Sequence, residues 1–205
     1  MMEVVERKGA RLAFLGVVRG PTPEGVRVRE AILERRPEAV ALSLGLEEVQ
    51  ALEAWDGEPV PPSSPEEEVY AREMRRFGEV RKPPPCYVEA LRAAVELGAA
   101  CVPVDMDEAA FSTAFTEHIG TIEMMRHGGF VDRKLPAHAF AARTPQSFAL
   151  EFDTLLTRMR GHRRLEATRE AHIAEALSAV LRKYRSSVAI VEIERAAGVL
   201  HRLRA

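Results

Sequence analysis

Four short apolar runs, separated by helical patterns, limit what this chain can fold into. They span residues 11–18, 39–44, 100–105 and 187–192 and are nearly continuous in Val, Ile, Leu, Ala and Phe. Continuous apolar runs are typical of strands that helices cover on both faces. Strands alternating with helices predict an α/β fold: a small, mostly parallel sheet of about four strands with helices on both faces. Pro103 favours an edge position or a bulge in the third strand, because proline cannot donate to a strand ladder.

The segments between these runs carry the signals of helix starts and ends: a capping threonine, a proline in the first turn and a terminal glycine. They predict helices over residues 22–36, 86–98, 107–120, from 144 onward and over 163–184. The stretch "GGFVDRKLP" (128–136) predicts a loop. We expect residues 1–205 to form a single α/β domain, with a helical insertion around residues 46–98.

Composition excludes several classes of protein. The chain has 205 residues, of which 46% are hydrophobic, and a formal net charge of −2, so we expect neither a nucleic acid nor a membrane as its partner. No run approaches the roughly 18 apolar residues of a membrane span, and the charged start lacks the apolar core of a signal peptide. Cys86 and Cys101 lack metal-site spacing and are too few for a disulfide framework. We therefore expect a soluble, cytoplasmic protein.

Two of the predicted strands lead directly into an arginine. "LGVVRGP" (15–21) delivers Arg19, and "IVEIERAAGV" (190–199) delivers Arg195. The carboxyl ends of parallel strands share one edge of a sheet, so we expect these arginines to meet there.

A third arginine interrupts an apolar helix face. Arg169 lies four residues from both Leu165 and Ile173 on the stripe of the 163–184 helix. Its charge must reach solvent, pair with a carboxylate such as Asp105, or line a pocket at the sheet edge.

The order of these segments resembles the TraB/Tiki family. The family pattern is a strand ending in GxxH, a second strand carrying a glutamate, a helix ending in LGA, a strand ending in DR, a helix beginning ERD, and a last strand ending in a second GxxH. The corresponding segments are "GVVRGP" (16–21), "RPEAVALSLGLEEVQAL" (36–52), "ELGAACVPVDMD" (96–107), "TREAHIAEAL" (168–177) and "VAIVEIERAAGV" (188–199). The resemblance implies a TraB-like α/β domain over most of the chain.

The chain departs from this pattern where the family holds its metal. The resemblance implies that two GxxH histidines and the strand-two glutamate bind a divalent metal for peptide-bond hydrolysis. Those three positions here are Arg19, Arg195 and Ser43, and Glu192 replaces the glycine of the second motif. A guanidinium offers no lone pair to a metal. We therefore expect no bound metal and no cofactor, and a protein that has lost metal-dependent hydrolysis.

Two interpretations of the altered site stay open. In the first, a small anionic ligand binds in an arginine-lined pocket at the carboxyl edge of the sheet through charge-assisted hydrogen bonds. Its candidate residues are Arg19, Ser43, Asp105, Arg169 and Arg195. In the second, Glu192 and Glu194 pair with the arginines and fill the former metal site.

Two other functions remain as alternatives. One is a hydrolase with a different metal or catalytic arrangement, using Asp105, Asp107 or the region of His118 and His127. The other is a homo-oligomeric interaction scaffold, with a homodimer built through apolar residues. The apolar candidates are Trp55, Phe111 and Phe115.

Overall fold

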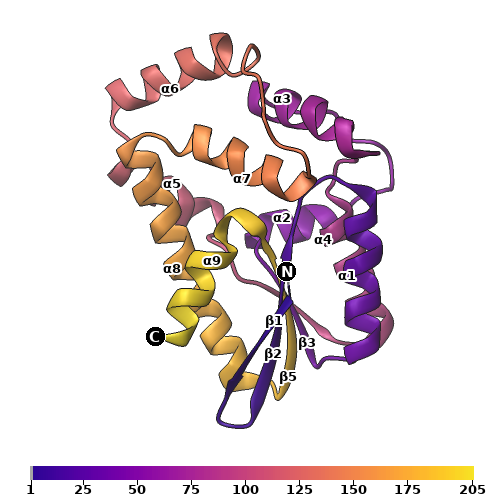
Figure 1. Ribbon diagram of the computed structural model, residues 1–205. Helices are drawn as coiled ribbons and strands as arrows, with labels where there is room; N and C mark the ends of the chain where they lie inside the picture. The colour runs from indigo at the N-terminus through magenta and orange to yellow at the C-terminus, as the bar shows by residue number, and fades with distance from the viewer. Residues whose placement is uncertain (1) are drawn as a thin grey trace.

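The computed structural model describes residues 2–205, which form a five-stranded sheet in the order β1-β2-β5-β3-β4 (Figure 1). β1 is antiparallel to β2, and all other pairs are parallel. The strands are β1 (Met2–Arg7), β2 (Ala10–Val17), β3 (Ala39–Leu42), β4 (Ala100–Pro103) and β5 (Ser186–Glu192). The predicted α/β fold with a mostly parallel sheet is confirmed, and the strand that contains Pro103 lies at an edge.

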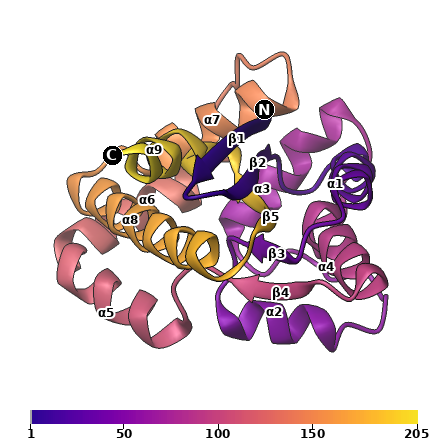
Figure 2. The same cartoon turned by 90° about the horizontal axis from the view of Figure 1, so that it is seen from below.

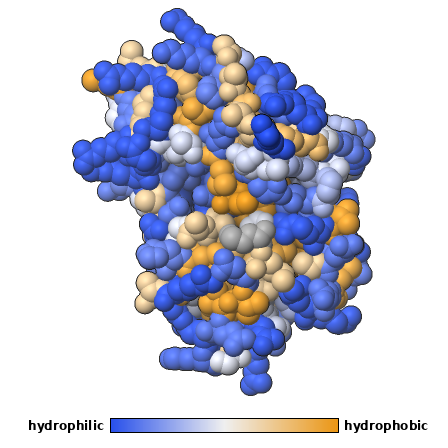
Figure 3. Space-filling view, in the orientation of Figure 1, coloured by the Kyte–Doolittle hydropathy of each residue, from blue (hydrophilic) through white to orange (hydrophobic). Residues whose placement is uncertain are grey.

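The first strand was not among the predicted ones. Its sequence, MEVVER, lacks the continuous apolar character of the other strands because β1 is an edge strand: Val5 is buried, whereas Met2 and Val4 are exposed. Lys8 and Gly9, both with positive φ, make the turn into β2. Figure 3 shows apolar residues gathered in the middle of one face, where β1 crosses the molecule in Figure 1.

Helices account for most of the remaining chain. They are α1 (Thr22–Arg35), α2 (Leu46–Glu53), α3 (Pro65–Met74), the 3-10 turn η1 (Arg75–Phe77), α4 (Pro85–Leu97), α5 (Glu108–His118), α6 (Thr121–Arg133), α7 (Pro145–Leu156), α8 (Arg160–Lys183) and α9 (Ile193–Arg204). The predicted loop over residues 128–136 is wrong for its first part, since α6 continues through Gly128 and Gly129. Burial of Phe130 and Val131 outweighs the poor helix propensity of the glycines. Within residues 2–205, no helix is both long and apolar enough to cross a membrane.

Helices pack on both faces of the sheet. Strand alternation sends Ala13 and Leu15 toward α1, α2 and α4, whereas Leu12 and Phe14 of the same strand pack against α8 and α9. Figure 2 shows the sheet between these two groups of helices. The central strands are buried on both faces, which explains why their sequences are continuously apolar.

A further group of helices lies beyond the carboxyl edge of the parallel strands. α3, α6 and α7 form this group at the top of Figure 1 and share a separate apolar cluster. Val18, just after β2, belongs to this cluster, and Tyr70 packs its ring against Phe148 and Phe152. The group therefore forms a wall above the strand ends, where an α/β protein usually holds its functional residues.

Candidate functional site

All of the residues predicted to form a site lie at the carboxyl edge of the sheet. Arg19 follows β2, Ser43 follows β3 and Asp105 follows β4, as the order of the strands predicts. Arg169 projects from α8. Arg195 was expected directly at the end of the last strand, but β5 ends at Glu192 and Arg195 lies in the first turn of α9.

Glu192 joins β3 to α9 through a buried set of contacts. Ser43 Oγ donates a hydrogen bond of 2.6 Å to Glu192 Oε2 and lies 3.0 Å from the hydroxyl of Tyr87. Arg195 Nη1 lies 3.4 Å from the same Glu192 oxygen. Glu192 thus binds both Ser43 and Arg195 through one carboxylate oxygen.

Glu166 extends these contacts to α8 and β4. Its Oε2 lies 2.8 Å from Arg195 Nε, and its Oε1 lies 3.3 Å from Arg169 Nη1. Arg169 in turn donates from Nη2 to Asp105 Oδ2 at 2.5 Å, and from Nε to Oδ1 at 3.4 Å. The carboxylate partner expected for Arg169 is therefore Asp105. We call the continuous series of Ser43, Glu192, Arg195, Glu166, Arg169 and Asp105 the ion-pair chain.

Arg19 lies beside the ion-pair chain without a direct contact to it. Its Nη2 donates to Glu194 Oε1 at 3.3 Å, and its guanidinium lies 5.8 Å from the centre of the Tyr70 ring. The Tyr70 hydroxyl donates to the backbone carbonyl of Arg19 and holds the strand end in place. The Arg19 side chain is 43% exposed, which makes it more open to solvent than Arg169 or Arg195.

The two neighbouring carboxyl groups at the start of α9 have opposite pKa shifts. Burial alone would raise the pKa of Glu192, but the charges of Arg195 and Arg19 outweigh it and hold that pKa at about 2. Burial raises the pKa of Glu194, and the charge of Glu192 adds to this effect although Arg19 opposes it. Glu192 is therefore firmly ionised, whereas the charge of Glu194 is less well compensated.

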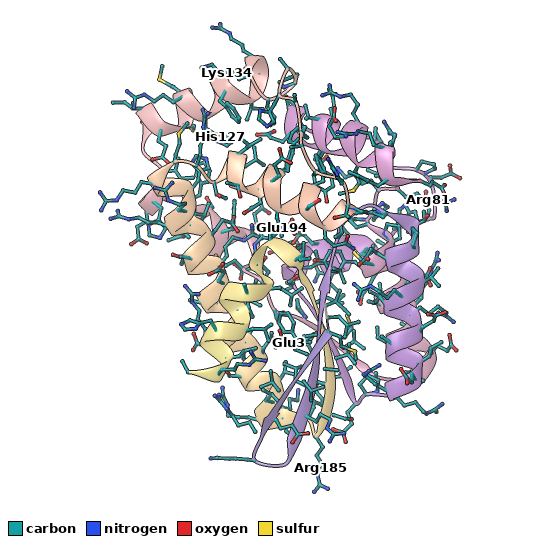
Figure 4. All side chains as sticks on the ribbon, viewed as in Figure 1. Glu3, Arg81, His127, Lys134, Arg185 and Glu194 are labelled. Carbon is teal, nitrogen blue, oxygen red and sulfur yellow. The ribbon has the colours of Figure 1, made fainter. Side chains whose placement is uncertain are left out.

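A pocket of about 240 Å³ opens beside the ion-pair chain, between α7, α8 and α9. Figure 4 shows Glu194 at the start of α9, beneath α7. The pocket is lined by Asp153, Thr157, Arg163, Glu166, Ala167, Glu170, Glu194 and Arg195. Burial, together with the charges of Glu166 and Glu194, raises the pKa of Asp153 to about 6. The lining thus combines guanidinium groups with an excess of carboxylates.

Several buried polar atoms at this edge have no hydrogen-bond partner among residues 2–205. They are Arg19 Nε, Glu194 Oε2, and Nε and Nη1 of Arg195. Arg195 Nε lies close to Glu166 Oε2, but the two atoms form an ion pair without the alignment of a hydrogen bond. Unpaired buried polar groups are uncommon in proteins and call for an explanation at each site.

Two residues of the site, Glu166 and Asp153, were not predicted from the sequence. Glu166 carries one signal, since it lies three residues before Arg169 and hence on the same helix face. Asp153 carries none, because its place depends on how α7 packs above the strand ends.

The histidines of the alternative hydrolase lie on different helices. His118 Nε2 is 2.9 Å from Thr168 Oγ1, whereas the His127 ring stacks on His162 with 4.1 Å between ring centres. Asp107 caps α5 by accepting from the amide of Ala110. In the part of the chain that the structure describes, no group of three or more His, Cys, Asp or Glu side chains is placed to hold a metal ion.

The apolar residues suggested for a dimer are only partly free. Trp55 packs against the core and donates from Nε1 to the carbonyl of Glu58. Phe111 is exposed and lies beneath the Arg169 guanidinium, and Phe115 packs against a small cluster between α5 and α8.

Replacing Glu192 by glutamine tests the electrostatics of the ion-pair chain. The pKa of Glu192 is about 2 in the folded protein and about 4.5 ordinarily, so its ionised form stabilises the fold above pH 4.5. This contribution, on the order of 3 kcal/mol, is lost as the pH falls from 4.5 toward 2. We expect Glu192→Gln to lower the free energy of unfolding in urea at pH 7, and the deficit to shrink between pH 5 and pH 3.

The exposed Glu175→Gln serves as the control, with no deficit at any pH. A deficit of Glu192→Gln that stays constant from pH 7 to pH 3 would show that the charge of Glu192 does not support the fold.

No protein-family model matches this chain, and a comparison with curated proteins finds no match. The resemblance to the TraB/Tiki family stays a prediction that rests on the succession of its motifs.

Proposed function

We propose that this chain is a divergent TraB/Tiki-like protein that has lost metal-dependent hydrolysis and binds a small ligand through a carboxylate or phosphate group. The observation that carries the ligand proposal is the incomplete hydrogen bonding of the Arg195 guanidinium. Its side chain is 9% exposed and lines the pocket, and its Nε and Nη1 face Glu166 and Glu192 in ion pairs that lack the alignment of hydrogen bonds. A ligand oxygen in the pocket would supply the guanidinium with an aligned acceptor.

The ion-pair chain supports this role by fixing the guanidinium. Glu192 and Glu166 contact Arg195 from two sides, so its guanidinium loses little conformational freedom when a ligand binds. Arg163, exposed at the rim of the same pocket, supplies a second cation. Arg19 contributes to the field of the site, although it does not line the pocket.

The loss of hydrolysis is proposed from the same residues. Arg19, Ser43 and Arg195 occupy the three positions that the resemblance assigns to metal ligands, and each contacts a carboxylate of this chain. Ser43 and Arg195 are engaged in the buried ion-pair chain, and neither guanidinium has a lone pair for a metal.

Titration calorimetry with acetate and with inorganic phosphate tests the ligand proposal. We expect saturable binding by the wild type, weak because carboxylates share the pocket. Arg163→Ala and Arg195→Lys should each weaken it about tenfold, since each removes or misplaces charge-assisted hydrogen bonds. Arg133→Ala, on the exposed side of α6, is the matched control and should bind as the wild type does. Absence of binding to the wild type, or equal binding by all variants, contradicts the proposal.

A peptidase assay tests the loss of hydrolysis. With Mn²⁺ or Zn²⁺ added, we expect cleavage of a fluorogenic peptide no faster than in buffer alone. Turnover that a chelator abolishes contradicts the proposal, and turnover that Asp105→Asn also abolishes favours the alternative hydrolase.

A further inference from the structure

Glu194 presents a buried oxygen that nothing in the described chain satisfies. Its side chain is 4% exposed and lines the pocket between α7, α8 and α9. Oε1 accepts from Arg19, whereas Oε2 has no hydrogen-bond donor among residues 2–205. An acceptor in this position fits a donor that enters from the pocket.

Asp153 supplies a second carboxylate to the same pocket. It forms no ion pair with any residue that the structure describes, and burial together with Glu166 and Glu194 raises its pKa. Glu166 and Glu170, the other carboxylates of the lining, are already paired with arginines. Negative charge is therefore least compensated at Asp153, which has no ion pair in the described chain, and at Glu194, where only Oε1 meets an arginine.

The buried atoms without a hydrogen bond thus fall into two chemical kinds. Arg195 offers N–H donors that Glu166 and Glu192 meet only as ion pairs, and Glu194 offers an oxygen that has no donor. A free anion would satisfy the first kind and be repelled by the second. A ligand that carries both charges close together would satisfy both.

We propose that the pocket binds a small zwitterion of the α-amino-acid type, with its ammonium group between Asp153 and Glu194 and its carboxylate toward Arg163 and Arg195. The carboxylate half of this inference rests on the proposed function, and the ammonium half is new. An ammonium group has three N–H donors and can serve both carboxylates at once. The pocket volume of about 240 Å³ lies below the roughly 300–1,000 Å³ of sites for drug-sized ligands, as suits a small molecule.

Calorimetry at pH 7.5 with glycine, acetate and methylamine separates the two halves of the ligand. We expect the wild type to bind glycine at least tenfold more tightly than either acetate or methylamine. Asp153→Asn should weaken glycine binding at least tenfold and leave acetate binding unchanged or stronger. Asp132→Asn, on the exposed face of α6, is the matched control and should bind all three as the wild type does.

The asparagine variant is suited to this test because it keeps the shape of Asp153 and removes a charge that its surroundings disfavour. A thermal melt of each variant with and without glycine gives a second readout, with a glycine-dependent rise expected for the wild type and the control only.

The outcomes distinguish failure of the ammonium site from failure of the proposed anion contact. Acetate binding with glycine no tighter overturns the ammonium site and leaves the proposed function standing. Methylamine binding without acetate binding supports the ammonium site and contradicts the proposed anion contact. No binding of glycine to the wild type, or equal glycine binding by Asp153→Asn, overturns the inference.

Discussion

The ion-pair chain at the carboxyl edge of the sheet is the interaction on which the site depends. It joins the ends of β3, β4 and β5 to α8 and α9 through alternating carboxylates and guanidinium groups. Ions withdrawn from water pay a large desolvation cost, so such a series is tolerated only when each charge meets an opposite one. Removal of one member leaves its neighbour as a buried charge without a partner. The geometry of the site therefore depends on the packing of the helices on the sheet.

The need for each buried charge to meet an opposite one distinguishes charges with a structural role from charges available to a ligand. Glu192, Glu166 and Asp105 each contact an arginine, and their role is accounted for by those contacts. Beside the middle of the series, next to α7, the compensation is incomplete, because Asp153 has no ion-pair partner in the described chain and Glu194 has an unsatisfied oxygen. The pocket lies there, lined by Glu166 and Arg195 of the series. A binding role is therefore proposed where the charges are unbalanced, and a structural role where they are balanced.

The sequence predicts the sheet well where helices cover both faces. The four continuous apolar runs became β2 to β5, whereas β1 escaped prediction because one face and one edge are open. The parallel order also placed the predicted residues at one edge. What the sequence does not contain is the packing of α7 above the strand ends and of α8 against the sheet, which brings Asp153 and Glu166 into the site. The place of Asp153 has no local signal, and the spacing of Glu166 from Arg169 shows only that the two share a helix face.

The most direct test of the central claim is a double-mutant cycle across the middle of the ion-pair chain, with Glu166→Gln and Arg195→Met, measured as free energies of unfolding in urea. If the charges act as one series, each single substitution strands the charges of its neighbours, and the double variant is more stable than the sum of the two effects by about 1–3 kcal/mol. Effects that add within about 0.5 kcal/mol contradict the account, since independent sites behave in that way.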